Sequence, residues 1–232
     1  MIYVSGGIQA PITGAQTRGQ LIVIEGLDAV GKTTTAILYA KNYGAKFIPW
    51  LQEPFRTAIR NVWRMQLNGL KISKNSEHLM FLGALRHLSD IIETEIMSGS
   101  DVVVDRYYHS TLAVHPPLAR HFNETPVIIS EDLIGVLKPD CCIQMRLNEQ
   151  ARLLRSKLDA GRTPSPVEIL LQTQSDFFNQ VRQNLLTQCE RGMAIPLQVD
   201  GMSPLEVVTL VYAHVTSSRQ NDHAGTKPQA SQ

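Results

Sequence analysis

The sequence predicts an α/β fold of three layers (αβα), in which helices cover both faces of a five-stranded parallel sheet. Two observations lead to this prediction. Short apolar runs, typical of buried strands, alternate with longer segments of helical periodicity along residues 20–217. No linker or internal repeat interrupts this stretch, whose length suits one large domain. This alternation favours a parallel sheet, because each helix returns the chain to the same end of the sheet.

Five segments have the length and composition of buried strands. They are rich in β-branched and other apolar residues and are bounded by turns or polar residues. The predicted strands are 21–24, 45–50, 101–105, 141–147 and 194–199.

The segments between these strands show helical spacing and recognisable ends. Asn68-Gly69 and Gly99 end two of them, Asn148 caps another, and Pro116-Pro117 is expected to stop the helix that follows residues 106–115. The other predicted helices are 33–42, 57–67, 76–99, 127–137, 149–160, 167–191 and 203–217.

The two ends of the chain lie outside this pattern. Residues 1–19 carry one arginine, no acidic residue and no basic amphipathic helix, and are expected to form a flexible extension. Residues 218–232 are polar and are expected to form a disordered tail.

Composition excludes several classes of protein. The 232 residues carry a net charge of +1, whereas proteins that bind the nucleic-acid backbone usually have a strong basic excess. No apolar run approaches the roughly 18 residues that cross a membrane. Cys141, Cys142 and Cys189 match neither a disulfide framework nor a zinc-binding spacing, which favours free thiols in a reducing compartment. We therefore expect a cytoplasmic protein without nucleic-acid or membrane partners, a mitochondrial location being the alternative.

A glycine-rich turn joins the first predicted strand to the first helix. Its spacing, Gly-x-x-x-x-Gly-Lys-Thr over residues 26–33, is typical of a phosphate-binding loop (P-loop). Its glycines allow backbone conformations that other residues avoid, and its amides point inward at a helix N-terminus. In this interpretation Lys32 contacts the outer phosphates of ATP and Thr33 binds Mg²⁺. The residues expected to bind the nucleotide are Gly26, Leu27, Asp28, Ala29, Val30, Gly31, Lys32, Thr33 and Thr34.

Charged residues follow two further strands at the same predicted edge of the sheet. Asp105 and Arg106 end the third strand, where the carboxylate can hold Mg²⁺ and the guanidinium can bind a phosphate with two hydrogen bonds. Arg56 follows the second strand and is either a second phosphate ligand or a solvent-exposed side chain. Two arginines facing one P-loop predict a second phosphorylated substrate.

Four stretches together resemble the thymidylate kinase family of nucleoside monophosphate kinases. They are residues 24–33, Glu53-Pro54, residues 105–107 and residues 176–182, and the resemblance extends from about residue 20 to about residue 215. It implies the nucleoside monophosphate kinase fold and a homodimer, for which helices 57–67 and 76–97 either supply the interface or are internal. Residues 105–111 and 137–140 are more similar to the mitochondrial-type UMP–CMP kinases, which are themselves related to thymidylate kinases.

The resemblance also implies roles for individual residues. Lys32 and Thr33 would bind ATP and Mg²⁺, Arg56 and Arg106 the monophosphate, and Asp28 would lie near the acceptor. Phe81 would stack on the base, unless it is a core residue, and Thr111 would contact the base. The base-reading arginine of the family falls at Leu85 here, and the nearest arginine is Arg86, one position later.

A catalytic arginine is supplied in this family either by the P-loop or by a lid. Ala29 and Val30 exclude the P-loop arrangement here, so the resemblance implies a lid at about residues 157–168 with Arg162 as its catalytic residue. Arg152 and Arg155 could flank Arg162 or form a solvated basic helix face.

The function predicted from these residues is the transfer of the γ-phosphoryl group of ATP to dTMP, which yields dTDP and ADP. The alternative enzyme is a UMP/CMP kinase, or a dUMP/dCMP kinase, of the same family. The alternative that is not an enzyme is a catalytically silent nucleotide-binding module. This alternative is disfavoured because the chain keeps the complete set of charged and hydroxyl residues, Lys32, Thr33, Asp105 and Arg106.

Overall fold

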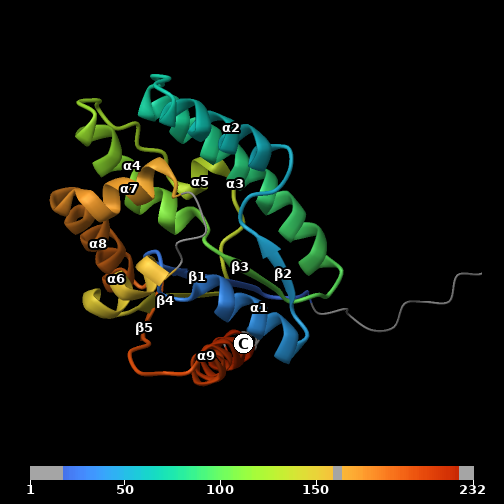
Figure 1. The fold of residues 1–232 in the computed structure, drawn as a ribbon. Helices are drawn as coiled ribbons and strands as arrows, with labels where there is room; N and C mark the ends of the chain where they lie inside the picture. The colour runs from blue at the N-terminus through green and yellow to red at the C-terminus, as the bar shows by residue number, and fades with distance from the viewer. Residues whose placement is uncertain (1–17, 159–163, 225–232) are drawn as a thin grey trace, which may run out of the picture.

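The computed structural model describes residues 18–158 and 164–224 (Figure 1). Within them, five parallel strands lie in the order β2-β3-β1-β4-β5, which confirms the predicted α/β class. Their bounds are β1 Leu21–Gly26, β2 Lys46–Pro49, β3 Val102–Asp105, β4 Cys141–Arg146 and β5 Ile195–Gln198.

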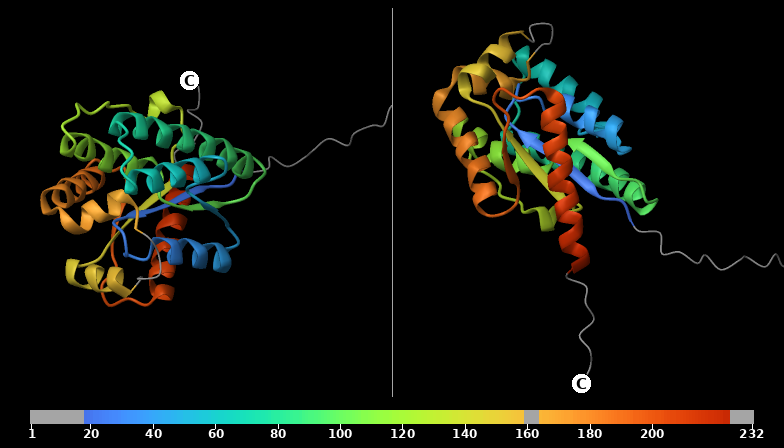
Figure 2. Two further views of the ribbon diagram at one scale, coloured as in Figure 1. Left: turned by 45° about the horizontal axis from the view of Figure 1, so that its top comes forward. Right: turned by 90° about the horizontal axis from the view of Figure 1, so that it is seen from below.

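Helices cover the two faces of this sheet. Their bounds are α1 Lys32–Tyr43, α2 Phe55–Leu67, α3 Lys74–Met97, α4 Tyr108–His121, α5 Glu131–Ile134, α6 Glu149–Leu158, α7 Pro166–Thr173, α8 Ser175–Glu190 and α9 Pro204–Ala224. Helices α1 and α9 share the core on one face. Helix α3 covers the other face with the start of α4, and α8 packs beside α4. In Figure 2, α9 (red) lies across the sheet on the side opposite α3.

Strand β1 lies at the centre of the sheet, and all of its residues are buried. Successive side chains of a strand point to opposite faces, so Leu21 and Val23 enter one core while Ile22 and Ile24 enter the other. A strand covered on both faces needs no polar alternation, which explains its continuous apolar run. This central position places the turn after β1 between the ends of β3 and β4.

Helix α4 continues through Pro116 and Pro117, so the stop predicted there was wrong. A proline inside a helix leaves the carbonyl four residues earlier without its usual donor. For Pro117 this carbonyl belongs to Ala113, and Nδ2 of Asn184 on α8 donates to it over 2.8 Å. The neighbouring helix therefore replaces the missing donor.

The helix predicted for residues 127–137 was also mostly wrong, because only Glu131–Ile134 is helical. Asn75 on α3 binds the backbone before it: its Nδ2 donates to the Thr125 carbonyl, and its Oδ1 accepts from the Val127 amide, both over 3.0 Å. These bonds hold the segment in an extended course along α3.

The helix predicted for residues 167–191 is two helices, with the break at Gln174. The backbone of Gln174 is extended, with φ −121° and ψ 97°. Leu171 of α7 and Phe177 of α8 then enter one core with Ala113 and Leu118 of α4. The break lets both helices turn an apolar side toward α4.

Other boundaries differ less. Helix α2 begins at Phe55, and α9 runs to Ala224, past the end expected near residue 217. Residues 1–17 of the expected extension and residues 225–232 of the expected tail lie outside the described residues.

Candidate active site

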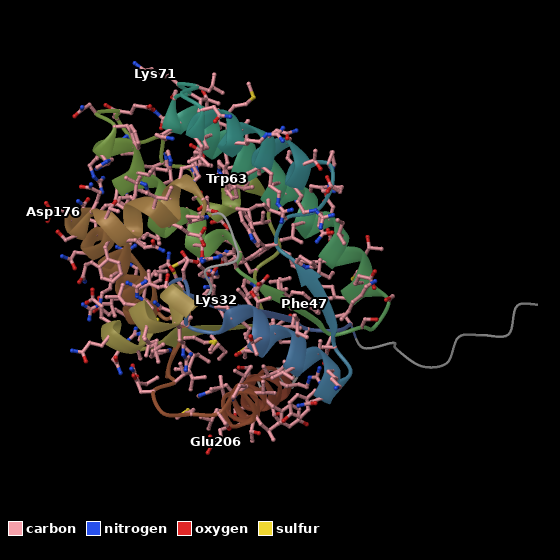
Figure 3. The ribbon with its side chains drawn as sticks, in the orientation of Figure 1. Lys32, Phe47, Trp63, Lys71, Asp176 and Glu206 are labelled. Carbon is pink, nitrogen blue, oxygen red and sulfur yellow. The ribbon has the colours of Figure 1, made fainter. Side chains whose placement is uncertain are left out.

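The P-loop lies between the end of β1 and the start of α1, where Figure 3 shows Lys32. Its backbone has positive φ angles at Gly26 (136°), Ala29 (64°) and Gly31 (101°). A Cβ atom at Gly26 would lie 2.4 Å from the carbonyl oxygen of Met145 on β4. Gly26 is therefore required both by its φ angle and by the close approach of β4.

Lys32 extends back over this loop. Its Nζ donates to the Leu27 carbonyl over 2.6 Å and lies 3.9 Å from Oδ1 of Asp28. The side chain is only 7% exposed, and burial, together with the charge of Arg106, lowers its pKa to about 8 against the opposing effect of nearby carboxylates. An incoming phosphate would supply the negative charge that favours the ammonium form.

Thr33 and Asp105 meet across the sheet edge. The Thr33 hydroxyl donates to Oδ2 of Asp105, and Asp105 is buried. Hydroxyl and carboxylate oxygens suit Mg²⁺, which usually takes one or two protein ligands and completes its shell with substrate phosphates and water. These two residues therefore fit the magnesium site predicted for them.

Arg106 directly follows β3 in a left-handed backbone conformation, with φ 75°. Its guanidinium pairs with Asp28 and donates to Ser110 Oγ over 3.1 Å and to the Gly26 carbonyl over 3.4 Å. Burial opposes its charge, but carboxylates led by Asp28 outweigh burial and raise its pKa. The structure thus brings Arg106, Asp28 and the P-loop together, and it holds Arg106 as a permanent cation.

Glu25 was not predicted as a site residue, yet it holds the backbone between β3 and α4 in place. It is 1% exposed. Its Oε1 accepts from the amides of Tyr107 (2.7 Å) and Ser110 (3.2 Å), and its Oε2 accepts from the Ser110 hydroxyl. The carboxylate therefore caps the start of α4 and fixes the turn that carries Arg106. The signal in the sequence was an acidic residue inside an apolar strand, because a buried charge requires partners.

Arg56 lies on the first turn of α2, away from these contacts. Its Nε donates to Oε1 of Glu53 over 2.8 Å, and its side chain is 45% exposed. Nε2 of His87 on α3 lies 3.0 Å from the Glu53 carbonyl oxygen, which joins this turn to α3.

Phe81 lies in an aromatic cluster between α2, α3 and the end of β2. Its ring centroid is 5.8 Å from that of Trp50 and 6.0 Å from that of Trp63, which Figure 3 labels. Phe81 is partly buried against the small core of Leu51, Ile59 and Ala84. Thr111, half-buried on α4, lies one turn beyond the start of that helix.

Arg86 has different neighbours. Its guanidinium pairs with Asp90, one turn along α3, and donates to the Gly135 carbonyl in the loop after α5. No hydrogen bond or ion pair between described residues joins Arg86 to Phe81 or to the residues around the P-loop.

A family model described as thymidylate kinase matches residues 24–209, from the end of β1 into α9. The chain belongs to the thymidylate kinase family. This confirms the resemblance and makes the chain a nucleoside monophosphate kinase, a phosphotransferase.

Two relatives illustrate the extent of this similarity. A thymidylate kinase of Glaesserella parasuis serovar 5 (strain SH0165) is 27% identical over 177 residues, covering 73% of this chain and 82% of the relative. A solved structure of thymidylate kinase from Candida albicans matches with a TM-score of 0.64 and 23% identity, covering 87% of this chain and 93% of that one. The structural match shows that the thymidylate kinase fold extends over most of the chain.

Among the lid arginines expected of a thymidylate kinase family member, Arg162 lies outside the described residues. Arg155 on α6 reaches the P-loop, where its Nη1 lies 3.5 Å from the Val30 carbonyl oxygen, to which it donates. Arg152 is buried, with its guanidinium carbon 4.8 Å from the centre of the Phe178 ring. The two arginines proposed to flank Arg162 therefore have separate environments.

Two further properties concern only the described part of this family member, residues 18–158 and 164–224. In it, no helix combines the length and apolar character needed to cross a membrane. No group of three or more His, Cys, Asp or Glu side chains is arranged to hold a metal ion there either.

Proposed function

We propose that this chain transfers the γ-phosphoryl group of ATP to dTMP and releases dTDP and ADP. The observation that carries the proposal is the convergence of Lys32, Thr33, Asp105 and Arg106 on one edge of the sheet, with Asp28 joined to Arg106. A site for the donor phosphates and a cation for an acceptor phosphate are adjacent in this arrangement.

The donor triphosphate would bind the P-loop. Its backbone amides and Lys32 would hold the phosphate oxygens, and Thr33 and Asp105 would hold a magnesium ion. When bound, the ion neutralises charge on the phosphate oxygens. Lys32 is already positioned by its bond to the Leu27 carbonyl, so little reorganisation is required when charge spreads over the transferring group.

The acceptor phosphate would bind Arg106. Its oxygen is ionised at neutral pH, so positioning and charge neutralisation matter more than a general base. Asp28 pairs with Arg106 and so fixes the direction of its guanidinium. Asp28 would also lie near the acceptor monophosphate when that substrate is bound. Arg56 would be the second acceptor ligand, because its exposed pair with Glu53 is weak enough to exchange for a phosphate. Arg162 would supply the lid cation.

The base would stack on the aromatic cluster around Phe81. A UMP/CMP kinase is the second candidate, and the contacts of Arg86 favour it, because that side chain is paired with Asp90 rather than directed to Phe81. Ser110 gives the second candidate no support, because its hydroxyl is engaged by Glu25 and Arg106.

The proposed enzyme would act as a homodimer. Several apolar side chains of α2, α3 and the loop between them are exposed, which supports an interface on this side: Met65, Leu67, Leu70, Leu79 and Met97. Sedimentation velocity of the wild type and of Leu79→Asp measures this directly.

A coupled ADP-release assay tests the activity. Purified protein with ATP and Mg²⁺ is offered dTMP, dUMP, UMP, CMP and dCMP separately at equal concentration. The proposal expects the highest kcat/KM with dTMP. A preference for UMP or CMP would transfer the conclusion to the second candidate, and ADP release independent of every monophosphate would overturn a kinase function.

A further inference from the structure

We propose that a basic cavity between the end of β4, α6 and α8 binds a small phosphate anion of about pyrophosphate size, at a site separate from the nucleotide centre. The cavity has a volume of about 260 Å³. Its wall includes three arginines, Arg146, Arg152 and Arg182, which come from β4, α6 and α8 in turn. Among the described residues that line it, Glu149 is the only carboxylate.

Arg152 gives the strongest evidence for an absent partner. The side chain is 3% exposed, and its buried Nε has no hydrogen-bond partner among the residues that the structure describes. The face of its guanidinium is covered by Phe178, which leaves the N–H edge for a ligand. A buried guanidinium with unused donors is costly unless an anion satisfies it.

Arg146 repeats the pattern at the end of β4. Its Nε is also buried and lacks a hydrogen-bond partner within residues 18–158 and 164–224, although another part of its side chain bonds to Cys189. Gln144, two residues earlier on the strand and therefore on the same face, contacts Cys189 of α8. Arg146 is thus directed toward the α8 side of the sheet, where Arg182 lines the same cavity.

The charges of the cavity select the ligand class. Among its described lining residues, three guanidinium groups against one carboxylate leave an excess of positive charge, which a multivalent anion offsets. Guanidinium groups match phosphate oxygens with paired hydrogen bonds, and they do so better than lysine would. The cavity volume of about 260 Å³ leaves ample room for a diphosphate.

The cavity is distinct from the nucleotide centre but shares a wall with it. Leu27 and Val30 of the P-loop line it, whereas Lys32, Thr33 and Asp105 do not. An anion in the cavity would therefore bind without contacting Lys32, Thr33 or Asp105.

Isothermal titration calorimetry with inorganic pyrophosphate tests the proposal on the full chain. The nucleotide centre is first saturated with a non-hydrolysable ATP analogue, Mg²⁺ and dTMP, so that pyrophosphate cannot bind the P-loop. We expect one further pyrophosphate per chain. Arg182→Gln should weaken its binding about tenfold, the usual cost of one charge-assisted hydrogen bond.

Matched variants make the result decisive. Arg191→Gln, an exposed change beyond the end of α8, should leave pyrophosphate binding unchanged. Arg146→Gln should weaken binding by a similar factor, and its melting temperature shows whether it remains folded. The proposal is overturned if the saturated protein takes up no pyrophosphate, or if Arg182→Gln, which alters an exposed residue, binds it as tightly as the wild type.

Discussion

The donor side and the acceptor side of the site differ in how their residues are connected. On the donor side, Lys32 donates to the Leu27 carbonyl of the P-loop and Thr33 bonds to Asp105. On the acceptor side, the predicted ligands are dispersed: Arg56 pairs with Glu53, and Arg86 pairs with Asp90. Arg106, the third predicted acceptor ligand, is connected to the donor side, because its partner Asp28 also lies 3.9 Å from Nζ of Lys32.

The difference follows from how each side is encoded. The P-loop is contiguous, so its spacing fixes its geometry directly. The acceptor side is assembled from α2, α3 and α4, where a shift of one residue turns a side chain by about 100° around the helix. Arg86 lies one position beyond the family's arginine, and this rotation is sufficient to direct it to Gly135 instead of the aromatic cluster. Phosphate binding is therefore predictable from a motif, whereas base recognition depends on packing.

The largest expected effect is on the donor side. Lys32→Met should lower kcat at least about 10²-fold, because it removes a preorganised cation from the transferring phosphoryl group. Steady-state kinetics with dTMP measures it. The control is Lys41→Met, a change at the other end of α1, which should leave kcat unaltered. Near wild-type turnover by Lys32→Met would contradict the prediction that the donor side contributes most to kcat.

Glu25→Gln tests the turn after β3 that carries Arg106, the acceptor ligand nearest the P-loop. The amide keeps one acceptor for the Tyr107 and Ser110 amides but loses the charge and introduces an unwanted donor. We expect kcat/KM for the monophosphate to fall about tenfold, with a smaller change in KM for ATP. Glu190→Gln, on the exposed end of α8, serves as the control. Equal losses for both substrates would indicate a general effect on the fold instead.

A pair of variants sharpens the assignment of the acceptor side. Arg56→Ala should raise KM for the monophosphate about fivefold, since a phosphate would lose one charged ligand. Arg86→Ala should change KM by less than about twofold, since its partners are Asp90 and Gly135. The reverse order of effects in steady-state kinetics would show that Arg86 reads the substrate after all.

The smallest effect concerns acid stability on the acceptor side. His78 and His115 stack with centroids 3.6 Å apart, and burial lowers the pKa of both, to about 4 for His78. Unfolded His78 would bind a proton near pH 6.5, whereas the folded form resists until about pH 4. Stability should therefore fall as pH decreases through this window. Urea unfolding at pH 7 and pH 5 should show a loss about 2 kcal/mol smaller in His78→Gln than in the wild type. An unchanged loss would assign the acid sensitivity to other groups.

Much of the fold could be predicted because its signals are local. Strand β1 is an apolar run, and the P-loop is defined by its own spacing. The failures all involve contacts between distant residues. Pro117 is tolerated because Asn184 donates a hydrogen bond to the carbonyl of Ala113. The sequence around residue 117 does not predict that bond. Likewise, Gln174 breaks a helix because both halves pack on α4.

The site shows the same division. Its phosphate ligands were predicted from the residues and their spacing, and the structure brings Lys32, Thr33, Asp105 and Arg106 together. Glu25 was missed because its partners lie more than eighty residues away in the chain. The binding and catalytic roles assigned to residues on both sides stay predictions.

The bonds between α8 and α4 have a mechanical consequence. Asn184 donates to the Ala113 carbonyl over 2.8 Å, and Gln188 donates to the His109 carbonyl over 2.9 Å. Prolines within a helix usually mark a point of bending. Here the two bonds from α8 hold the turns of α4 that come before Pro116 and Pro117. A displacement of α8 should therefore also displace α4 and Arg106, which lies just before the start of α4. The position of Arg106 relative to the P-loop is therefore expected to depend on how α8 is placed against α4.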